Sequence, residues 1–276
     1  MPASASRLFE PFCGSAAVAL AFASVRPAVS IRLNDKNQPL ADLWQRIIFE
    51  PEQLADDYQQ MWEDQLPDPR TYYDVVRDRF NASGEPVLLL YLLARCVKAA
   101  VRYNSRGDFN QSPDNRRLGT RPERMRAQIC HASSLLQNRA QVSAVDFMEA
   151  LDSATSDDVV YLDPPYQGVS TNRDRRYRDV LPYDDFVNAL GVLNSRGLSY
   201  VVSYDGRTGA KTFGRALPGA LRLQRLEVNA GRSTQATFLG RTDLTVESVY
   251  LSPALVERLT DDPPNIPSKC ERGGAT

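Results

Sequence analysis

The pattern of apolar and polar positions at the start of the chain predicts a strand, a helix and a second strand. Arg7–Phe9 is a short apolar segment that runs into a turn, and Ala16–Val25 is rich in alanine, which favours a helix. Val29–Leu33 has the composition of a strand and ends at a polar pair. Two strands joined by a helix pair in parallel with a right-handed crossover, so this segment predicts a βαβ unit.

Helical spacing dominates the next part of the chain. Leu43, Ile47 and Ile48 recur at helical intervals, and Val87–Val101 has the pattern of a strongly apolar helix with basic residues near its end. Tyr103–Pro122 is polar and contains glycine, proline and asparagine, which predicts a long loop. Loops of this length in compact proteins usually carry function or are disordered.

The alternation of strands and helices returns after this loop. The last two predicted strands flank a polar segment, which indicates an antiparallel pair. The predicted strands are Val142–Val145, Val159–Leu162, Ser199–Tyr204, Leu221–Val228 and Val246–Leu251, and the predicted helices are Arg124–Asn138, Met148–Ala154 and Tyr183–Ser195.

These elements predict an α/β protein with a Rossmann-like sheet and an inserted, mainly helical domain. We expect one sheet domain from residues 1–40 and 131–260, a helical insert at 41–130, and a disordered tail at 261–276, which is rich in proline and glycine.

Composition narrows the class of protein. Apolar residues make up 42% and charged residues 24% of the 276 residues, as in ordinary globular proteins. The single histidine, His131, makes a histidine-ligated metal site unexpected, and we predict no metal. The four cysteines lack a C-x-x-C pair, no apolar run approaches the roughly 18 residues of a membrane span, and the start lacks a secretory pattern. We therefore expect a cytoplasmic protein without a membrane segment.

Charge is unevenly distributed, although the net charge is only −1. Residues 50–85 contain ten acidic and three basic residues, whereas residues 95–126 contain nine basic and three acidic residues. A second basic cluster, residues 173–178, holds four arginines and one aspartate. Arginine has a planar fork that suits phosphate groups and guanine edges, so both segments are candidates for nucleic-acid binding, the alternative being solvated helix faces.

The motif Asp163-Pro164-Pro165-Tyr166 follows an apolar strand and is the strongest chemical signal. Open α/β sheets bind ligands at the carboxyl ends of their strands. The Asp163 carboxylate and the Pro164 carbonyl can each accept one hydrogen of an amino group, and the Tyr166 ring can stack on a heterocycle. The alternative is a proline turn in which Asp163 serves only as a cap.

Three other predicted strand ends carry polar or small residues. Glu10-Pro11-Phe12-Cys13-Gly14-Ser15 opens the first helix, where small residues and free N–H groups allow a ligand to approach. Asp35 follows the second strand and is placed to accept hydrogen bonds from ribose hydroxyls. Asp146-Phe147 follows a later strand and can contact an adenine ring.

Four segments, in order, carry a family resemblance. FEPFCGSAAVAL, LNDKNQPL, SAVDFMEAL and VVYLDPPY resemble the motifs of the Dam-like, alpha-ordered adenine-specific DNA methyltransferases. Arg102–Asn110 is similar to that family's R-x-N-x-x-G-x-F-N segment. The resemblance covers Leu8–Leu251.

The resemblance implies a Rossmann-like methyltransferase sheet with a target-recognition insert, S-adenosylmethionine as cofactor, and an adenine flipped out of double-stranded DNA as substrate. A cognate restriction endonuclease is a further expected partner, in a prokaryotic or phage context. The implied cofactor residues are Glu10, Pro11, Phe12, Gly14, Ser15, Asp35, Asp146, Phe147 and Asp163. The implied catalytic residues are Asp163, Pro164, Pro165 and Tyr166. The implied DNA contacts are Arg102, Asn104, Arg106, Asn110, Arg116, Arg117, Arg173, Arg175 and Arg176.

One expected motif is missing. The family carries a Gly-Gly-Lys segment before the first strand, and residues 1–7 contain none. A start assigned too late, a pocket completed by another segment, or a catalytically impaired DNA-binding homologue would each explain this. Methylation of the cytosine N4 amino group, of RNA or of protein glutamine are further alternatives. Cytosine and glutamine enzymes usually have serine or asparagine in place of Asp163.

Overall fold

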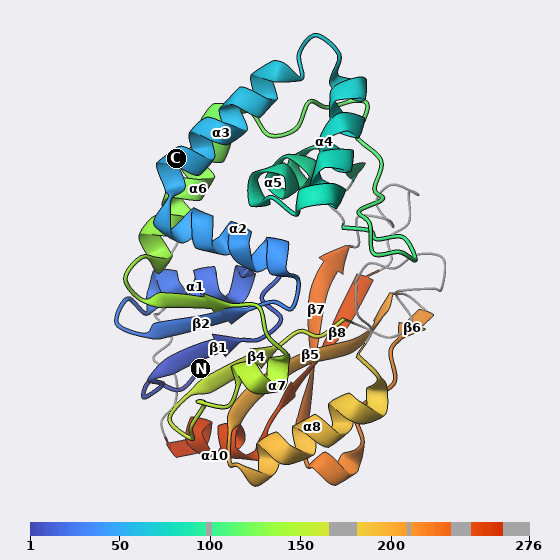
Figure 1. The fold of residues 1–276 in the computed structure, drawn as a ribbon. Helices are drawn as coiled ribbons and strands as arrows, with labels where there is room; N and C mark the ends of the chain where they lie inside the picture. Colours follow the sequence, from blue (N-terminus) through green and yellow to red (C-terminus); the bar gives the residue numbers. More distant parts are fainter. Residues whose placement is uncertain (98–100, 166–180, 209–210, 233–243, 262–276) are drawn as a thin grey trace, which may run out of the picture.

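The computed structural model describes residues 1–97, 101–165, 181–208, 211–232 and 244–261, and Figure 1 shows their fold. The strands form one mixed sheet in the order β3-β2-β1-β4-β5-β8-β7, and a short strand, β6, pairs with β5. The strands are β1 (Arg7–Glu10), β2 (Ser30–Asn34), β3 (Ala140–Ser143), β4 (Val159–Leu162), β5 (Ser199–Thr208), β6 (Lys211–Phe213), β7 (Gln224–Arg232) and β8 (Leu244–Leu251).

The sheet is parallel from β3 to β5 and antiparallel beyond. Strand β1 pairs with β2 through Leu8 and Ile31 and with β4 through Leu8 and Val159, both in parallel. Strand β8 runs antiparallel to both β5 and β7, which confirms the predicted antiparallel pair. Because the direction of strand succession reverses between β1 and β4, this is the switch point at which open α/β sheets bind ligands.

The helices divide between the two faces of the sheet. They are α1 (Ala17–Val25), α2 (Gln38–Phe49), α3 (Pro51–Asp64), α4 (Pro69–Ser83), α5 (Pro86–Arg95), α6 (Pro122–Leu136), α7 (Phe147–Ala150), α8 (Tyr183–Ser195) and α10 (Pro253–Asp261). Helices α1 to α6 share a core with one face, and α7 and α8 share a second core with the other. The α/β class predicted from the sequence is confirmed.

Proline sets the starts of the helices in the insert. Each helix from α2 to α6 has proline in its first turn, where the missing N–H is not needed and the fixed φ favours a helix. The Asp68 carboxylate also caps α4 by accepting the Thr71 N–H. Short connections therefore separate the helices from α2 to α5, whereas residues 96–121 separate α5 from α6. These helices lie together on one side of the sheet in Figure 1.

The insert is continuous with the sheet in its packing. One cluster of buried side chains extends from Leu8 and Ile31 on the sheet through Trp44 to Tyr73 and Leu92 in the insert. Helix α2 also contacts β3, and α6 contacts α1. The predicted domain boundaries at residues 41 and 130 therefore stay a prediction.

Several predicted elements differ in length from the observed ones. Helix α5 ends at Arg95 and not at Val101, because Cys96 is extended and forms a bridge with Pro113. The short helix α7 ends at Ala150, and β3 ends at Ser143. Strand β5 is longer than predicted, and the sequence analysis missed α10. The predicted disordered tail beyond Asp261 lies outside the described residues.

Candidate functional site

The ends of four parallel strands bring the predicted carboxylates to one edge of the sheet. Glu10 ends β1, Asp35 follows β2, Asp146 precedes α7 after β3, and Asp163 follows β4. These strands are neighbours in the order β3-β2-β1-β4, so their carboxyl ends lie side by side. We call this group of residues the carboxylate edge.

Asn34 holds the loops of the carboxylate edge together. Its amide nitrogen donates to the carbonyl oxygens of Pro11 and Val145, at 3.0 Å each, and its amide oxygen accepts from Ser143 Oγ at 2.8 Å and from the Val145 N–H at 3.0 Å. The residue is only 2% exposed. The sequence analysis did not assign it a role, although a polar residue at the end of a buried strand is a signal that could have found it.

The loop after β1 is fixed by backbone contacts on both sides of Gly14. The Gly14 N–H donates to Asp35 Oδ2 at 3.1 Å, and its carbonyl accepts from Trp44 Nε1 at 2.9 Å. Gly14 has a φ of +47°, and no heavy atom lies within 4 Å of the position that a Cβ would occupy. The backbone is therefore open to a ligand here, as the sequence analysis predicted.

Asp35 organises this loop through both of its carboxylate oxygens. Oδ1 accepts the Asn37 N–H at 3.0 Å, and Oδ2 accepts from Gly14. Burial raises the pKa of Asp35, and the two amide hydrogen bonds oppose that shift. A carboxylate oxygen accepts more than one hydrogen bond, so ribose hydroxyls can still bind to this half-buried side chain.

Glu10 is almost fully buried and contacts the start of α1. Its Oε2 accepts the Ala19 N–H at 2.9 Å, which satisfies a free amide of a helix that has no cap from its own N-cap residue. Burial raises the pKa of Glu10 to about 7; the Ala19 amide lowers it, and the negative charge of Asp163 raises it further. Glu10 therefore binds the start of α1 from a buried position, and its pKa depends on the charge of Asp163.

The aromatic residues at this edge pack against one another. The rings of Phe12 and Phe147 lie 5.0 Å apart between centroids, and Phe147 also contacts Phe186 of α8. Asp146 is exposed and caps α7 by accepting the Met148 N–H at 3.0 Å. The predicted pair Asp146-Phe147 thus consists of one exposed carboxylate and one buried ring.

The Asp-Pro-Pro segment lies directly at the switch point. Asp163 is exposed, Pro164 is buried and Pro165 is half-buried, whereas Tyr166 lies outside the described residues. Tyr161, two residues earlier on β4, has its pKa raised to about 12 by burial and then by the charges of Asp163 and Glu10. The charges of Asp163 and Glu10 therefore act on the Tyr161 hydroxyl at the ends of β1 and β4.

The predicted DNA-binding segment forms a small hairpin. Tyr103 and Phe109 form an antiparallel bridge, and the Asn104 side chain holds the turn by accepting the N–H groups of Arg106 and Asp108. Asn104 Nδ2 also donates to Asp108 Oδ2 at 2.9 Å. The hydrogen-bonding groups of Asn104 are thus used inside the turn, so this residue positions the hairpin and its predicted DNA contact gains no support.

The arginines around this hairpin differ in exposure. The Arg106 side chain is 82% exposed at the tip of the turn and contacts Asp108. Arg116 and Arg117 are exposed further along the loop, Asn110 is exposed, and Arg102 is half-buried. The second basic cluster, with predicted contacts Arg173, Arg175 and Arg176, lies outside the described residues.

The hairpin is tied to the carboxylate edge. Asn37 Nδ2 donates to the Tyr103 hydroxyl at 3.0 Å, and the Asn37 backbone N–H binds Asp35. Asn37, in the loop before α2, therefore connects Asp35, the predicted acceptor for ribose hydroxyls, with the predicted DNA-binding hairpin.

Across residues 1–97, 101–165, 181–208, 211–232 and 244–261, no three His, Cys, Asp or Glu side chains are grouped so that they could hold a metal ion. Within the same ranges, no helix combines the length and the apolar character that crossing a membrane requires.

Comparison with known proteins supports the family resemblance. A profile of the D12 class N6 adenine-specific DNA methyltransferases matches residues 1–218. The Retron Ec67 DNA adenine methylase of Escherichia coli is 29% identical over 196 residues, which cover 69% of this chain and 64% of the relative. The DNA adenine methylase of Serratia marcescens is 28% identical over 167 residues, or 59% of this chain and 58% of the relative.

A third relative is a methyltransferase of type II by its name. The Type II methyltransferase M1.LlaDCHI of Lactococcus lactis subsp. cremoris is 26% identical over 218 residues, which cover 74% of this chain and 73% of the relative. The chain spans less than two thirds of the length of the two DNA adenine methylases. Because the profile matches most of its 276 residues, the chain belongs to the D12 class N6 adenine-specific DNA methyltransferase family.

Proposed function

We propose that this chain transfers a methyl group from S-adenosylmethionine to the N6 amino group of an adenine flipped out of duplex DNA. The observation that carries the proposal is the position of Asp163-Pro164 after β4, at the switch point of the sheet and beside the end of β1. Ligands of open α/β sheets bind at this place. Family membership and the names of the relatives support the same reaction and the same substrate.

The residues of the carboxylate edge fit a cofactor with a ribose, an adenine and a positively charged sulfur. Gly14 leaves open space beside the backbone, Asp35 offers carboxylate oxygens for hydroxyl groups, and Phe12 offers a half-buried ring. Asp146 would accept a hydrogen bond from the adenine amino group. When bound, S-adenosylmethionine supplies an electrophilic methyl group.

Asp163 and Pro164 would bind the amino group of the target base. Each accepts one N–H, through the carboxylate and through the backbone carbonyl, and this draws the nitrogen toward tetrahedral geometry. Its lone pair then forms the new N–C bond as the S–C bond breaks, and one proton leaves to solvent. Asp163 therefore acts by positioning and electrostatic stabilisation, and no general base is required.

The basic loop of the insert would hold the DNA while the base occupies the carboxylate edge. Arg102, Arg106, Arg116 and Arg117 are the described members of this group, and the exposure of the last three favours contacts to phosphate groups. Base flipping is required because the amino group of a stacked, paired adenine cannot reach such a pocket. A cytoplasmic location and a cognate restriction endonuclease remain predictions, the second favoured by the name of the Lactococcus relative.

The test is methyl transfer from radiolabelled S-adenosylmethionine to unmethylated genomic DNA, followed by nucleoside analysis. Label in N6-methyladenine is the expected result. Label in N4-methylcytosine would assign the site to the other base. The absence of label with DNA still bound would favour the impaired homologue, and an RNA substrate in the same assay serves as the control for nucleic-acid class.

A further inference from the structure

Glu10 is a buried carboxylate without a positively charged partner among the residues that the structure describes. It is 3% exposed at the end of β1, and its Oε2 accepts the Ala19 N–H at 2.9 Å. No lysine or arginine of the described residues forms an ion pair with it. A buried carboxylate without a counter-ion is costly, so such a group either binds a cation or takes up a proton. An ionised Glu10 therefore requires a positive charge that these residues do not supply.

The groups that face Glu10 carry negative charge or none. The negative charge of Asp163, after the neighbouring strand β4, acts on the Glu10 carboxyl. On β4 itself, burial raises the pKa of the Tyr161 hydroxyl to about 12, and in the loop after β1 burial raises the pKa of the Cys13 thiol, so both groups are neutral at pH 7. Helix α1 (Ala17–Val25) offers backbone amides and has no charged side chain. The surroundings of Glu10 thus disfavour its ionised form.

The neighbouring strand on the other side adds a further carboxylate. Glu10 lies opposite Leu33 of β2 in the parallel register, and Asp35 follows that strand. On its first side, β1 pairs with β4 through Phe9 and Val160, and Asp163 follows β4. Neighbouring strands are about 4.8 Å apart, so three carboxylates lie at the ends of three adjacent strands. This part of the carboxylate edge has the charge of a site for a cation.

The proposed reaction indicates where a positive charge would lie. The amino group of the target base is bound by Asp163 and Pro164, and its nitrogen must contact the methyl group that it receives. The sulfur that carries this methyl group also carries the positive charge. That charge therefore lies near the Asp163 carboxylate, and the charge of Asp163 acts in turn on Glu10.

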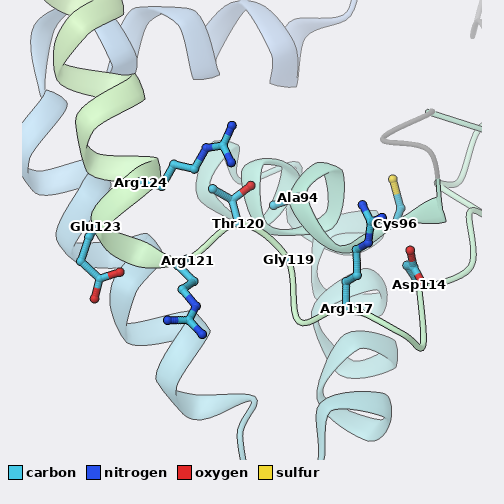
Figure 2. Close-up of a pocket in the computed structure, with 9 residues that line it drawn as sticks. All are labelled: Ala94, Cys96, Asp114, Arg117, Gly119, Thr120, Arg121, Glu123 and Arg124. Carbon is cyan, nitrogen blue, oxygen red and sulfur yellow. The ribbon is translucent and has the colours of Figure 1, made fainter.

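The helical insert offers the opposite environment. A cavity of about 680 Å³ lies there between the end of α5 and the start of α6. Figure 2 shows the charged residues of its lining, which are Arg117, Arg121, Arg124, Asp114 and Glu123. This lining has more positive than negative groups. A positively charged sulfur is therefore favoured at the carboxylate edge and not in this cavity.

We propose that Glu10 and Asp163 together provide the counter-charge for the positive sulfur of S-adenosylmethionine. The ionised form of Glu10 favours this charged cofactor, and the protonated form favours the neutral sulfur of the product, S-adenosylhomocysteine. Glu10 thereby distinguishes the cofactor from the product by charge, in addition to binding the start of α1. The inference rests on the proposed function, because that reaction supplies the positive sulfur.

A change in protonation should accompany binding of the cofactor. Burial raises the pKa of Glu10 to about 7, so about half of these side chains carry a proton at pH 7 when no ligand is bound. A nearby cation favours the ionised carboxylate, so S-adenosylmethionine should displace this proton. S-adenosylhomocysteine has no charge on its sulfur and should leave the proton in place.

The first test measures the protons released on binding, by calorimetric titration of the full chain at pH 7 in buffers of different ionisation enthalpy. With S-adenosylmethionine, the wild type should release about half a proton more than Glu10→Gln, which keeps an acceptor for the Ala19 N–H and cannot ionise. With S-adenosylhomocysteine, the two proteins should not differ. The amino group of each ligand titrates in both proteins, so the difference between them isolates Glu10.

Glu63→Gln is the matched control for this test. Glu63 is exposed on α3 (Pro51–Asp64), and its carboxylate accepts a hydrogen bond from Gln59 in the same helix. This variant should release as many protons as the wild type with either ligand. Equal proton release by the wild type and Glu10→Gln with S-adenosylmethionine overturns the proposal.

The second test compares affinities at pH 6 and pH 8. Relative to Glu10→Gln, the wild type should bind S-adenosylmethionine about 10-fold more tightly at pH 8, because the ionised fraction of Glu10 rises from about 0.1 to about 0.9. No such gain is expected for S-adenosylhomocysteine. An equal gain for both ligands would show that Glu10 does not recognise the charge on sulfur, and it overturns the proposal, as does the absence of any gain.

A third measurement needs only the wild type, so it does not depend on folding of the variant. In infrared difference spectra at pH 7, the C=O stretching band of a protonated carboxyl group should weaken when S-adenosylmethionine binds and should stay when S-adenosylhomocysteine binds. A band that behaves in the same way with both ligands overturns the proposal.

Failure of this inference can be distinguished from failure of the proposed function. If the wild type binds S-adenosylmethionine and methylates adenine in DNA, but releases no more protons than Glu10→Gln, only the role of Glu10 is wrong. If the wild type does not bind S-adenosylmethionine, the proposed function is wrong and the role of Glu10 falls with it.

Discussion

The loops of the carboxylate edge and the basic loop of the insert are held in place by different kinds of side chain. At the carboxylate edge, acidic side chains are themselves the ordering groups: Asp35 and Glu10 accept backbone amides, and Asn34 joins three loops. In the insert, buried side chains such as Arg95 and Tyr58 bind the carbonyls of the loop. Its exposed arginines lie beside carboxylates a few residues away, as Arg106 does with Asp108. We therefore expect the first arrangement to suit chemistry that needs exact placement of groups, and the second to suit binding to a polyanion.

The largest effect should come from Asp163 at the carboxylate edge. Asp163→Ala removes an acceptor for the target amino group, so methyl transfer at saturating DNA should fall by about 100- to 1,000-fold or more. DNA affinity should stay near the wild-type value, because phosphate contacts supply most of it. Single-turnover transfer and anisotropy on the same preparations would measure both, and transfer at the wild-type rate would remove Asp163 from the reaction.

The second-largest effect should be a pH dependence of the stability that comes from Glu10. The pKa of Glu10 is raised from 4.5 to about 7 in the folded chain, which corresponds to about 3 kcal/mol of stability. Because the folded pKa is the higher one, this stabilisation is fully present below about pH 4.5 and is lost as the pH rises through about 7. Glu10→Gln keeps an oxygen acceptor for the Ala19 N–H and cannot ionise.

The stability of the wild type relative to Glu10→Gln should therefore decrease between pH 5 and pH 8. Urea unfolding of both proteins at these two pH values measures the difference. A difference that is the same at both values would show that Glu10 does not titrate in this range. A variant of the insert serves as the comparison, since the stability difference between the wild type and Arg117→Gln should be the same at both pH values.

A smaller effect should follow from loss of the Asp35 carboxylate. Asp35→Ala removes the acceptor for the Gly14 and Asn37 amides and the proposed ribose ligand, so S-adenosylmethionine should bind about 10- to 100-fold more weakly. Asp42→Ala is the matched control, because Asp42 lies on α2 and its carboxylate accepts a hydrogen bond from Gln38 in the same helix. Calorimetric titration with the cofactor measures both, and equal affinities would remove Asp35 from the cofactor site.

The smallest effect is expected at the tip of the hairpin. The Arg106 side chain is highly exposed and, among the residues that the structure describes, pairs with Asp108 of its own turn. Arg106→Gln should lower the salt slope of DNA binding by up to about 0.9 and leave the free energy of unfolding within about 0.5 kcal/mol of the wild type. An unchanged slope would place the tip of the hairpin away from DNA.

The positions of the carboxylates at the edge could be predicted from the sequence, because they depend on local order. A strand that ends in a polar residue brings that residue to the edge of a parallel sheet, so Glu10, Asp35, Asp146 and Asp163 could be placed from their positions alone. Asn34 also ends a buried strand, but its partners Pro11, Ser143 and Val145 could not be predicted, since they meet it only in the folded sheet.

The insert was harder to predict because its order comes from distant contacts. The sequence indicated a polar loop and helices, but not that Arg95 ends α5 and binds the loop 19 and 22 residues later. The same local pattern suggested DNA contacts for both Asn104 and Arg117. The fold shows how the two residues differ. The Asn104 side chain is hydrogen-bonded within its own turn, whereas Arg117 lines a cavity.

The most direct test of the central claim is the nucleoside composition of DNA from bacteria that lack adenine methylation and express this chain. We expect N6-methyladenine in cells with the wild type and none above background in cells with Asp163→Ala. N4-methylcytosine in place of N6-methyladenine would show that cytosine is the substrate, and equal N6-methyladenine with both proteins would show that Asp163 is not needed for the reaction.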